Sequence, residues 1–218
     1  ELTLTDASVT YSDADTANGI NADVSKEIVA QINAEKTSVA KYGGYYIGRY
    51  EVGKNGDTAV VKYNQTPYAS ITWSTAYGLA KKIITNSEAT SYLCSSYAWD
   101  TAVNFIQNNS TAKNYATSIE GFNGNWNPQE VKDPSGNVIK PAGTSQQLNT
   151  GLTAQFCNIF DIGGNEAEFT TELNPGTSET VVLRGGFNYG RYPAGYRWDN
   201  RSGYADIAYG FRATLFLK

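Results

Sequence analysis

The chain has 218 residues and a net charge of −4, with charged side chains at only 17% of positions but 16 tyrosines and 21 glycines. Histidine is absent, which excludes the commonest metal ligand and the commonest general base. No apolar run reaches the roughly 18 residues of a spanning helix, so we expect a soluble chain without membrane insertion. The acidic net charge argues against nucleic-acid binding, and the composition is typical of a loop-rich extracellular or virion protein. Because methionine is also absent, we expect that sequence upstream of residue 1 has been removed.

The N-terminal region is predicted to hold a strand, a linker and a short helix. Residues 1–11 alternate apolar and polar side chains, which indicates an edge strand, and a turn-rich linker follows. Val24, Ile28 and Ile32 recur at helical spacing, so we predict a short amphipathic helix with Asp23 as its N-cap.

Strand and turn signals follow this helix. Residues 45–52, rich in aromatic and β-branched side chains, predict a strand that forms a hairpin with residues 59–63 through the turn at 55–57. From residue 121 to 151 the composition predicts long loops, interrupted by a surface hairpin around DPSGN at 133–137.

Two helices are predicted between these strands and the long loops. Ser74 can cap the first, and the second fits 97–106 with Ser95 or Ser96 as its cap. Strands near both ends of this region, with helices and loops between them, predict an α+β domain whose terminal strands pair. Cys94 and Cys157 are expected to be free, although one disulfide is also compatible with the sequence.

Five of the six arginines lie in the last 35 residues, which hold one lysine and two aspartates and so carry a net charge of +4. Tyrosine and tryptophan alternate with these arginines, and serine, glycine and asparagine lie between them. This mixture is typical of a recognition surface, because rigid rings and planar guanidinium groups contact partners at low entropic cost. An alternative is that the rings and arginines pack along a strand pair; we favour binding because few glutamates lie near the arginines in the sequence.

Four stretches in chain order resemble the formylglycine-generating sulfatase-modifying domain, a variant of the C-type lectin fold. They are YYIGRYEV at 45–52, ITWSTAYGLAKKI at 71–83, NIFDIGGNEAEFTTE at 158–172, and VLRGG at 182–186 followed by GFRATL at 210–215. The resemblance implies a C-type lectin-like domain over residues 42–218, with a small antiparallel sheet, two helices and long loops. Residues 1–41 would precede it as a strand, linker and short helix.

The resemblance does not extend to the family's known chemistry. Its enzymes hold copper through two cysteines between the RGG and GFR strings, and this interval, 187–209, contains no cysteine. The related sulfoxide synthases need histidine ligands for iron, and histidine is absent. We therefore expect no enzyme; the alternative is a metal-dependent oxidase of this family with an unrecognised site.

The same interval resembles the variable region of proteins diversified by retroelements, in which adenines near the 3′ end of the gene are substituted. Asparagine codons altered in this way yield Tyr, Asp, Ser, Gly, Arg, Ala, Ile and Phe, which are largely the residues found between 187 and 209. The resemblance implies a protein or glycan receptor on a target cell as partner, and a location on a phage tail or a bacterial surface. A plain structural module of a tail or pilus is a third possibility. The residues predicted to contact the ligand are Phe187, Asn188, Tyr189, Arg191, Tyr192, Tyr196, Trp198, Asp199, Asn200, Arg201, Tyr204, Asp206, Ile207 and Tyr209.

The resemblance also implies a structural calcium ion near the GNEAEF string. Matching by position makes Asp161 and Glu168 side-chain ligands and gives Gly164 and Glu166 as carbonyl ligands, a set of oxygens that suits calcium. The alternative, weighted equally, is that these acids bind backbone amides or pair with Arg184 or Arg212.

Overall fold

The computed structural model describes residues 10–133, 135–153, 155–174 and 180–218, and the edge strand expected near Leu2 and Leu4 lies outside them. The helices are α1 (Asp13–Ala17), α2 (Ala22–Tyr42), α3 (Trp73–Ile83), α4 (Ser96–Asn109) and the 3₁₀ turn η1 (Arg201–Gly203). The strands are β1 (Tyr46–Ile47), β2 (Gly53–Asn55), β3 (Thr58–Val60), β4 (Thr66–Pro67), β5 (Ala89–Leu93), β6 (Val131–Lys132), β7 (Val138–Lys140), β8 (Gln155–Phe156), β9 (Ile159–Phe160), β10 (Ala167–Leu173), β11 (Val181–Arg184), β12 (Arg197–Asn200), β13 (Tyr209–Phe211) and β14 (Ala213–Leu217). Within the described ranges, no helix is long and apolar enough to span a membrane.

Side-chain caps fix where the N-terminal helices begin. The predicted linker contains α1, because Ser12 and Asp15 form a capping box at its start. The predicted cap of α2 is wrong: the Asn21 side chain accepts from the backbone amides of Asp23 and Val24. The helix then runs for 21 residues, longer than expected, and ends at Gly43, whose φ of 79° favours glycine.

The two later helices agree with the sequence more closely. Thr72, not Ser74, caps α3, since its hydroxyl accepts from the amide of Thr75. Ser95 caps α4 as predicted, accepting from the amide of Ala98. Both helices bury one apolar side against the sheets, as their sequence periodicity predicts.

The first sheet has the order β1–β14–β5 and brings together strands far apart in the sequence. Tyr46 of β1 lies opposite Leu215 of β14, which confirms that strands near the two ends of the domain pair. Only the turn of the predicted hairpin was right: the hairpin joins β2 to β3, whereas β1 pairs with β14. The predicted surface hairpin is confirmed as β6–β7.

A second sheet has the order β12–β11–β10–β13 and carries the candidate site. Its first three strands are antiparallel, but β13 runs parallel to β10, with Glu168 beside Gly210. The chain leaves β12 through η1 and a loop and enters β13 in the direction of β10. The expected single antiparallel sheet is therefore replaced by several small sheets in a mixed α+β chain.

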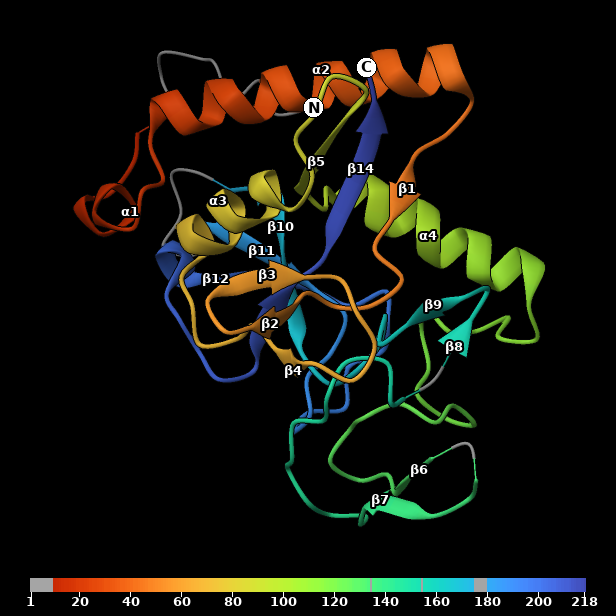
Figure 1. Ribbon diagram of the computed structural model, residues 1–218. Helices are drawn as coiled ribbons and strands as arrows, with labels where there is room; N and C mark the ends of the chain where they lie inside the picture. The colour runs from red at the N-terminus through yellow and green to blue at the C-terminus, as the bar shows by residue number, and fades with distance from the viewer. Residues whose placement is uncertain (1–9, 134, 154, 175–179) are drawn as a thin grey trace.

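Two buried clusters form the core. One joins α3 to the second sheet and includes Trp73, Phe169 and Phe211; the other surrounds Trp99 and Trp126. Figure 1 shows α2 lying across one end of the molecule near the end of β14, with the β6–β7 loops at the opposite end. The sheet that carries the site lies between these ends.

Candidate functional site

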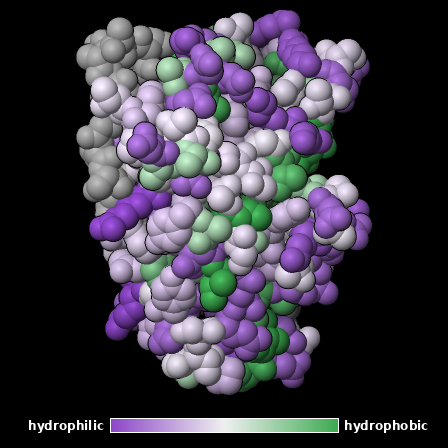
Figure 2. Space-filling model, turned by 90° about the vertical axis from the view of Figure 1, so that its left-hand side faces the viewer, coloured by the Kyte–Doolittle hydropathy of each residue, from purple (hydrophilic) through white to green (hydrophobic). Residues whose placement is uncertain are grey.

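The candidate site is formed by two connections of the second sheet. The first, residues 185–196, joins β11 to β12; the second, residues 201–208, leads from β12 through η1 to β13. The two connections leave opposite ends of β12 but meet where the hydroxyl of Tyr189 donates to Asp206 at 3.5 Å. Figure 2 faces the side on which β12 lies in Figure 1, and hydrophilic side chains there interrupt the hydrophobic patches.

Seven aromatic rings from these connections and strands form a continuous cluster. Phe187 lies at its centre, with its ring centroid 4.2 Å from that of Tyr189, 5.2 Å from Tyr192 and 5.1 Å from Trp198. Tyr192 stacks on Tyr196 at 4.3 Å. On the other side, Tyr209 lies 5.8 Å from Trp198 and 5.9 Å from Tyr204. Ring contacts of this kind stabilise by about 0.5–1.5 kcal/mol beyond the area that they bury.

Burial divides the predicted contact residues into two sets. We call the buried residues Phe187, Asn188, Asn200 and Tyr209 the floor, and the others form the surface. The exposed side chains include Tyr189 (43%), Tyr196 (37%), Tyr204 (45%) and Ile207 (70%). Tyr192 and Trp198, which belong to the surface, are half-buried.

Four residues predicted to contact the ligand are buried, which corrects the sequence prediction. Phe187 and Tyr209 belong to the core cluster of α3 and the second sheet. Asn188 and Asn200 are also buried, and Asn200 donates to the carbonyl of Tyr204. These four side chains support the surface from beneath and do not form part of it.

The connection 185–196 is held mainly through its backbone. The indole of Trp126 donates to the carbonyl of Tyr192 at 2.8 Å, and that of Trp99 donates to the carbonyl of Ala194 at 2.9 Å. The backbone amide of Gly195 donates to the carbonyl of Ala116, and that of Asn188 donates to the carbonyl of Asn165. These contacts do not depend on the side chain at the position that they hold.

Glycine is required at Gly186, where the loop meets Trp126. A Cβ atom on Gly186 would lie 2.2 Å from the carbonyl oxygen of Tyr192 and 2.9 Å from Nε1 of Trp126. The RGG string therefore allows the loop to approach the tryptophan that anchors it.

Four of the five arginines of the C-terminal segment have carboxylate partners, and the pairing of Arg212 with Glu168 is the alternative that the sequence left open. Arg184 pairs with Asp100, Arg191 with Glu120 at 3.2 Å, Arg197 with Glu172 at 2.5 Å, and Arg212 with Glu168 at 2.6 Å. Each of these acids lies outside the segment, so the sequence near the arginines could not reveal it. Among the described residues, only Arg201 of the five lacks a carboxylate partner.

Glu172 shows how one such pair is built. Partial burial would raise the pKa of its carboxyl, but hydrogen bonds from Arg197 and Ser96 outweigh burial and hold the pKa below its ordinary value. The Arg191–Glu120 pair is exposed on both sides, so it contributes little to stability. Tyr189 lies beside Asp206, and partial burial together with that acid raises the pKa of its hydroxyl.

A buried acidic cluster lies behind the site. Glu51, Asp161, Glu166 and Glu168 are all at most 1% exposed, and Arg212 is the basic group among them. Burial raises the pKa of each of these carboxyls, and repulsion from neighbouring acids adds to the rise for Glu51, Glu166 and Glu168. A Cβ atom at Gly210 would lie 1.7 Å from Oε2 of Glu166, so the GFR string needs glycine there.

The acids expected to bind calcium already form hydrogen bonds or ion pairs with other groups of the protein. Glu168 accepts two bonds from Arg212, at 2.6 and 3.0 Å, and Asp161 accepts from Thr153 and from the amide of Gly151. The Gly164 carbonyl accepts from the amide of Glu166. In the part of the chain that the structure describes, no three acidic, histidine or cysteine side chains are placed to hold an ion together.

These contacts therefore favour an ion pair for Glu168, and hydrogen bonds from a hydroxyl and a backbone amide for Asp161, over a calcium ion bound by both. Glu166 differs, because it accepts from Gln147 through Oε1 while its buried Oε2 lacks a partner among the described residues. Calcium at this place stays a prediction.

A scan against protein-family models finds no match, and a search of curated proteins finds no relative. Among solved structures, the chain is similar to the crystal structure of CarF, with 13% identity and a TM-score of 0.44 over 84% of this chain and 82% of that one. It is also similar to Treponema denticola variable protein 1, with 18% identity and a TM-score of 0.40 over 76% of this chain and 61% of that one. With TM-scores this low, the likenesses carry no conclusion about activity or partners.

The residues that sequence reasoning missed are those that hold the site from outside it. Trp126 lies in a segment predicted only as loop, and Trp99 lies in the helix predicted over 97–106, for which no contact with the site was predicted. A tryptophan within a stretch rich in Asn, Gly and Pro was the available signal, since a large ring in a loop needs a burial site. The carbonyl that its indole would bind could not be read from the sequence.

Proposed function

We propose that this chain is a non-enzymatic binding protein with a C-type lectin-like fold, and that the exposed part of residues 187–209 contacts its partner. The observation that supports this most strongly is the way the connection 185–196 is fixed. Core tryptophans bind its carbonyls, while the side chains of Tyr189, Tyr192 and Tyr196 extend from the anchored backbone. Such a frame tolerates different side chains without losing its own shape.

The contact surface would consist of exposed rings over an aromatic floor, with Arg201 at its edge. Rigid rings whose lower layer is already packed lose little conformational entropy when a partner binds. Arg201 adds a guanidinium group that is not engaged by an internal carboxylate, so it is available to an acidic or carbonyl group of the partner. A protein or glycan on the surface of a target cell is the proposed partner, and a phage tail or bacterial surface the proposed location.

We further propose that a retroelement diversifies this surface. The residue types between 187 and 209 are those reached by adenine substitution in asparagine codons, and the backbone anchoring explains how a fold would survive such changes. A reverse-transcriptase gene beside this gene, with a near-copy of its 3′ end that differs only at adenines, would support the proposal. If the neighbouring DNA holds neither, diversification is refuted and the binding proposal is judged by the following experiment.

The experiment compares binding of purified variants to a glycan array and to a panel of bacterial cells. Tyr204→Ala removes an exposed ring of the site, and Tyr46→Ala removes an exposed ring of β1 as the matched control. We expect Tyr204→Ala to weaken binding by about 30-fold, the loss typical of an aromatic hot spot, and Tyr46→Ala to leave it unchanged. Equal effects of the two variants would refute the proposed surface. Retention of copper by the purified protein, together with turnover of a thiol peptide, would favour the alternative of a metal-dependent oxidase.

A further inference from the structure

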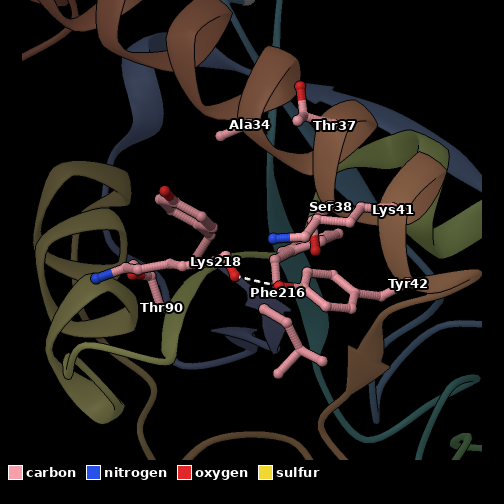
Figure 3. A pocket seen from close by; sticks show the side chains of 10 residues that line it. Ala34, Thr37, Ser38, Lys41, Tyr42, Thr90, Phe216 and Lys218 are labelled. Carbon is pink, nitrogen blue, oxygen red and sulfur yellow. Dashed lines mark hydrogen bonds between the residues drawn. The ribbon is translucent and has the colours of Figure 1, made fainter.

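A groove lies between α2 and the first sheet, on a different part of the molecule from the aromatic site. Its volume is about 280 Å³, close to the lower limit of the roughly 300–1,000 Å³ of small-molecule pockets. Helix α2 forms one wall, and β5 and β14 form the other (Figure 3). The lining residues used below are Ser38, Lys41, Tyr42, Tyr92, Phe216 and Lys218.

The groove combines aromatic walls with positive charge. The ring centroids of Tyr92 and Phe216 lie 6.1 Å apart on the sheet wall, and Tyr42 closes one end, where its hydroxyl donates to the main-chain carboxyl oxygen of Lys218. The ammonium group of Lys41 lies 4.7 Å from the centre of the Tyr42 ring. No acidic side chain is among the lining residues. The second lysine, Lys218, is engaged, because its ammonium group donates to the carbonyl of Asn86 at 2.6 Å.

A buried hydroxyl on the helix wall of the groove lacks a partner. Ser38 is 4% exposed and lines the groove, yet its hydroxyl has no partner among the described residues. Thr214 lies opposite Tyr92 in β14, hence on the same face of the sheet, and its buried hydroxyl also lacks a partner within the described chain. Buried polar groups usually have a hydrogen-bond partner, so the Ser38 hydroxyl is a donor that a ligand or a water in the groove can use.

Ser38 and Lys41 are three residues apart on α2, so their side chains are neighbours on one helix face. Both can donate hydrogen bonds, and a carboxylate accepts from several donors at once. Glu35, the acid one turn before Ser38 on α2, is buried and does not line the groove, so it does not compete for them. Its carboxylate lies on the core side, where it accepts from Gln31 at 2.7 Å and from Ser95 at 3.3 Å.

We propose that this groove binds a small organic carboxylate with an aromatic body. The rings of Tyr92 and Phe216 contact the body, and Lys41 and Ser38 donate to the carboxylate. A neutral amide of the same shape keeps the ring contacts but loses the charge-assisted hydrogen bonds, which are about twice as strong as neutral ones.

Phenylacetate is a suitable probe, with phenylacetamide as its uncharged counterpart, and binding to the full chain is measured by calorimetric titration. We expect saturable 1:1 binding of phenylacetate, about tenfold weaker in Lys41→Gln and for the amide, a loss of about 1.4 kcal/mol, because each change removes a charge-assisted hydrogen bond. Lys26→Gln is the matched control, because Lys26 lies on the same helix, pairs with Asp23 and does not line the groove.

Three outcomes would overturn the proposal: no saturable binding at millimolar phenylacetate, equal affinity for acid and amide, or equal losses in the two lysine variants. Thermal unfolding of each variant verifies that the fold is retained. Ser38→Ala provides a second measurement, since it removes a donor from the groove without changing charge, and we expect a severalfold loss of affinity for phenylacetate. Tyr204→Ala, in the aromatic site, is expected to leave phenylacetate binding unchanged.

Discussion

The division of the aromatic cluster into floor and surface makes a direct prediction about Phe187. This side chain is 4% exposed and contacts the rings of Tyr189, Tyr192 and Trp198 at centroid distances of 4.2 to 5.2 Å. Replacement by alanine would remove a ring on which three others pack. The surrounding rings are attached to a loop anchored through its backbone, so they cannot collapse fully into the space.

Truncation of a buried phenylalanine in such a setting costs about 3–5 kcal/mol. For a chain of this length, 1 kcal/mol shifts the midpoint of thermal unfolding by roughly 2–4 °C, so we expect Phe187→Ala to lower it by roughly 6–20 °C. Thermal unfolding followed by circular dichroism measures the shift, and urea unfolding gives the free energy of unfolding at constant temperature.

Tyr204→Ala is the matched comparison within the same cluster. Its ring is 45% exposed and contacts one other ring, that of Tyr209, at 5.9 Å. We expect it to lower the free energy of unfolding by less than about 1 kcal/mol, as most exposed substitutions do. If Phe187→Ala costs no more than Tyr204→Ala, Phe187 is not a floor residue and the division into floor and surface is wrong.

Three further predictions concern the buried acids. Burial raises the pKa of Glu35 from 4.5 to about 7, which corresponds to about 3 kcal/mol, so its ionisation should destabilise the fold as the pH rises through that interval. Urea unfolding should therefore show Glu35→Gln more stable than the parent at pH 8 and similar to it at pH 4; a constant difference at both pH values would contradict this. Gly210→Ala would place a Cβ atom 1.7 Å from Glu166, so we expect a loss of about 1–3 kcal/mol, which the double variant with Glu166→Ala should partly restore in the same assay. If calcium binds near Glu166, its addition after chelation should raise the midpoint of thermal unfolding; no change at millimolar calcium would remove that prediction.

Local signals in the sequence predicted much of the fold. Most of α4, its Ser95 cap, which was one of two predicted, and the β6–β7 hairpin depend on neighbouring residues, and they were predicted correctly. The cap of α2 was misplaced by two residues because Asn21 and Asp23 are both good N-caps, and only the geometry of the chain entering the helix distinguishes them. The pairing of β1 with β14 follows from topology, although the hairpin was assigned to the wrong strand.

The sequence predicted which residue types form the candidate site but not which of them are buried and which are exposed. Phe187, Tyr189 and Tyr209 look alike in a list of aromatic residues, yet two lie in the core and one is exposed. Alternation along a strand could not separate them, since the first two lie in a loop. The partners of Arg191 and Arg197 are likewise distant in the sequence, at Glu120 and Glu172, and only the fold brings them together.

The way the site is anchored bears on what can vary in it. A loop held by side-chain contacts would change shape whenever those side chains changed. Here Trp126 and Trp99 bind the carbonyls of Tyr192 and Ala194, so a substitution at either residue leaves the acceptor in place. Gly186 is different, because any Cβ atom there would separate the loop from Trp126. The positions that can vary are therefore those whose side chains are exposed, and the constrained ones include Gly186, the buried Phe187 and Ala194, and the two tryptophans that bind the loop.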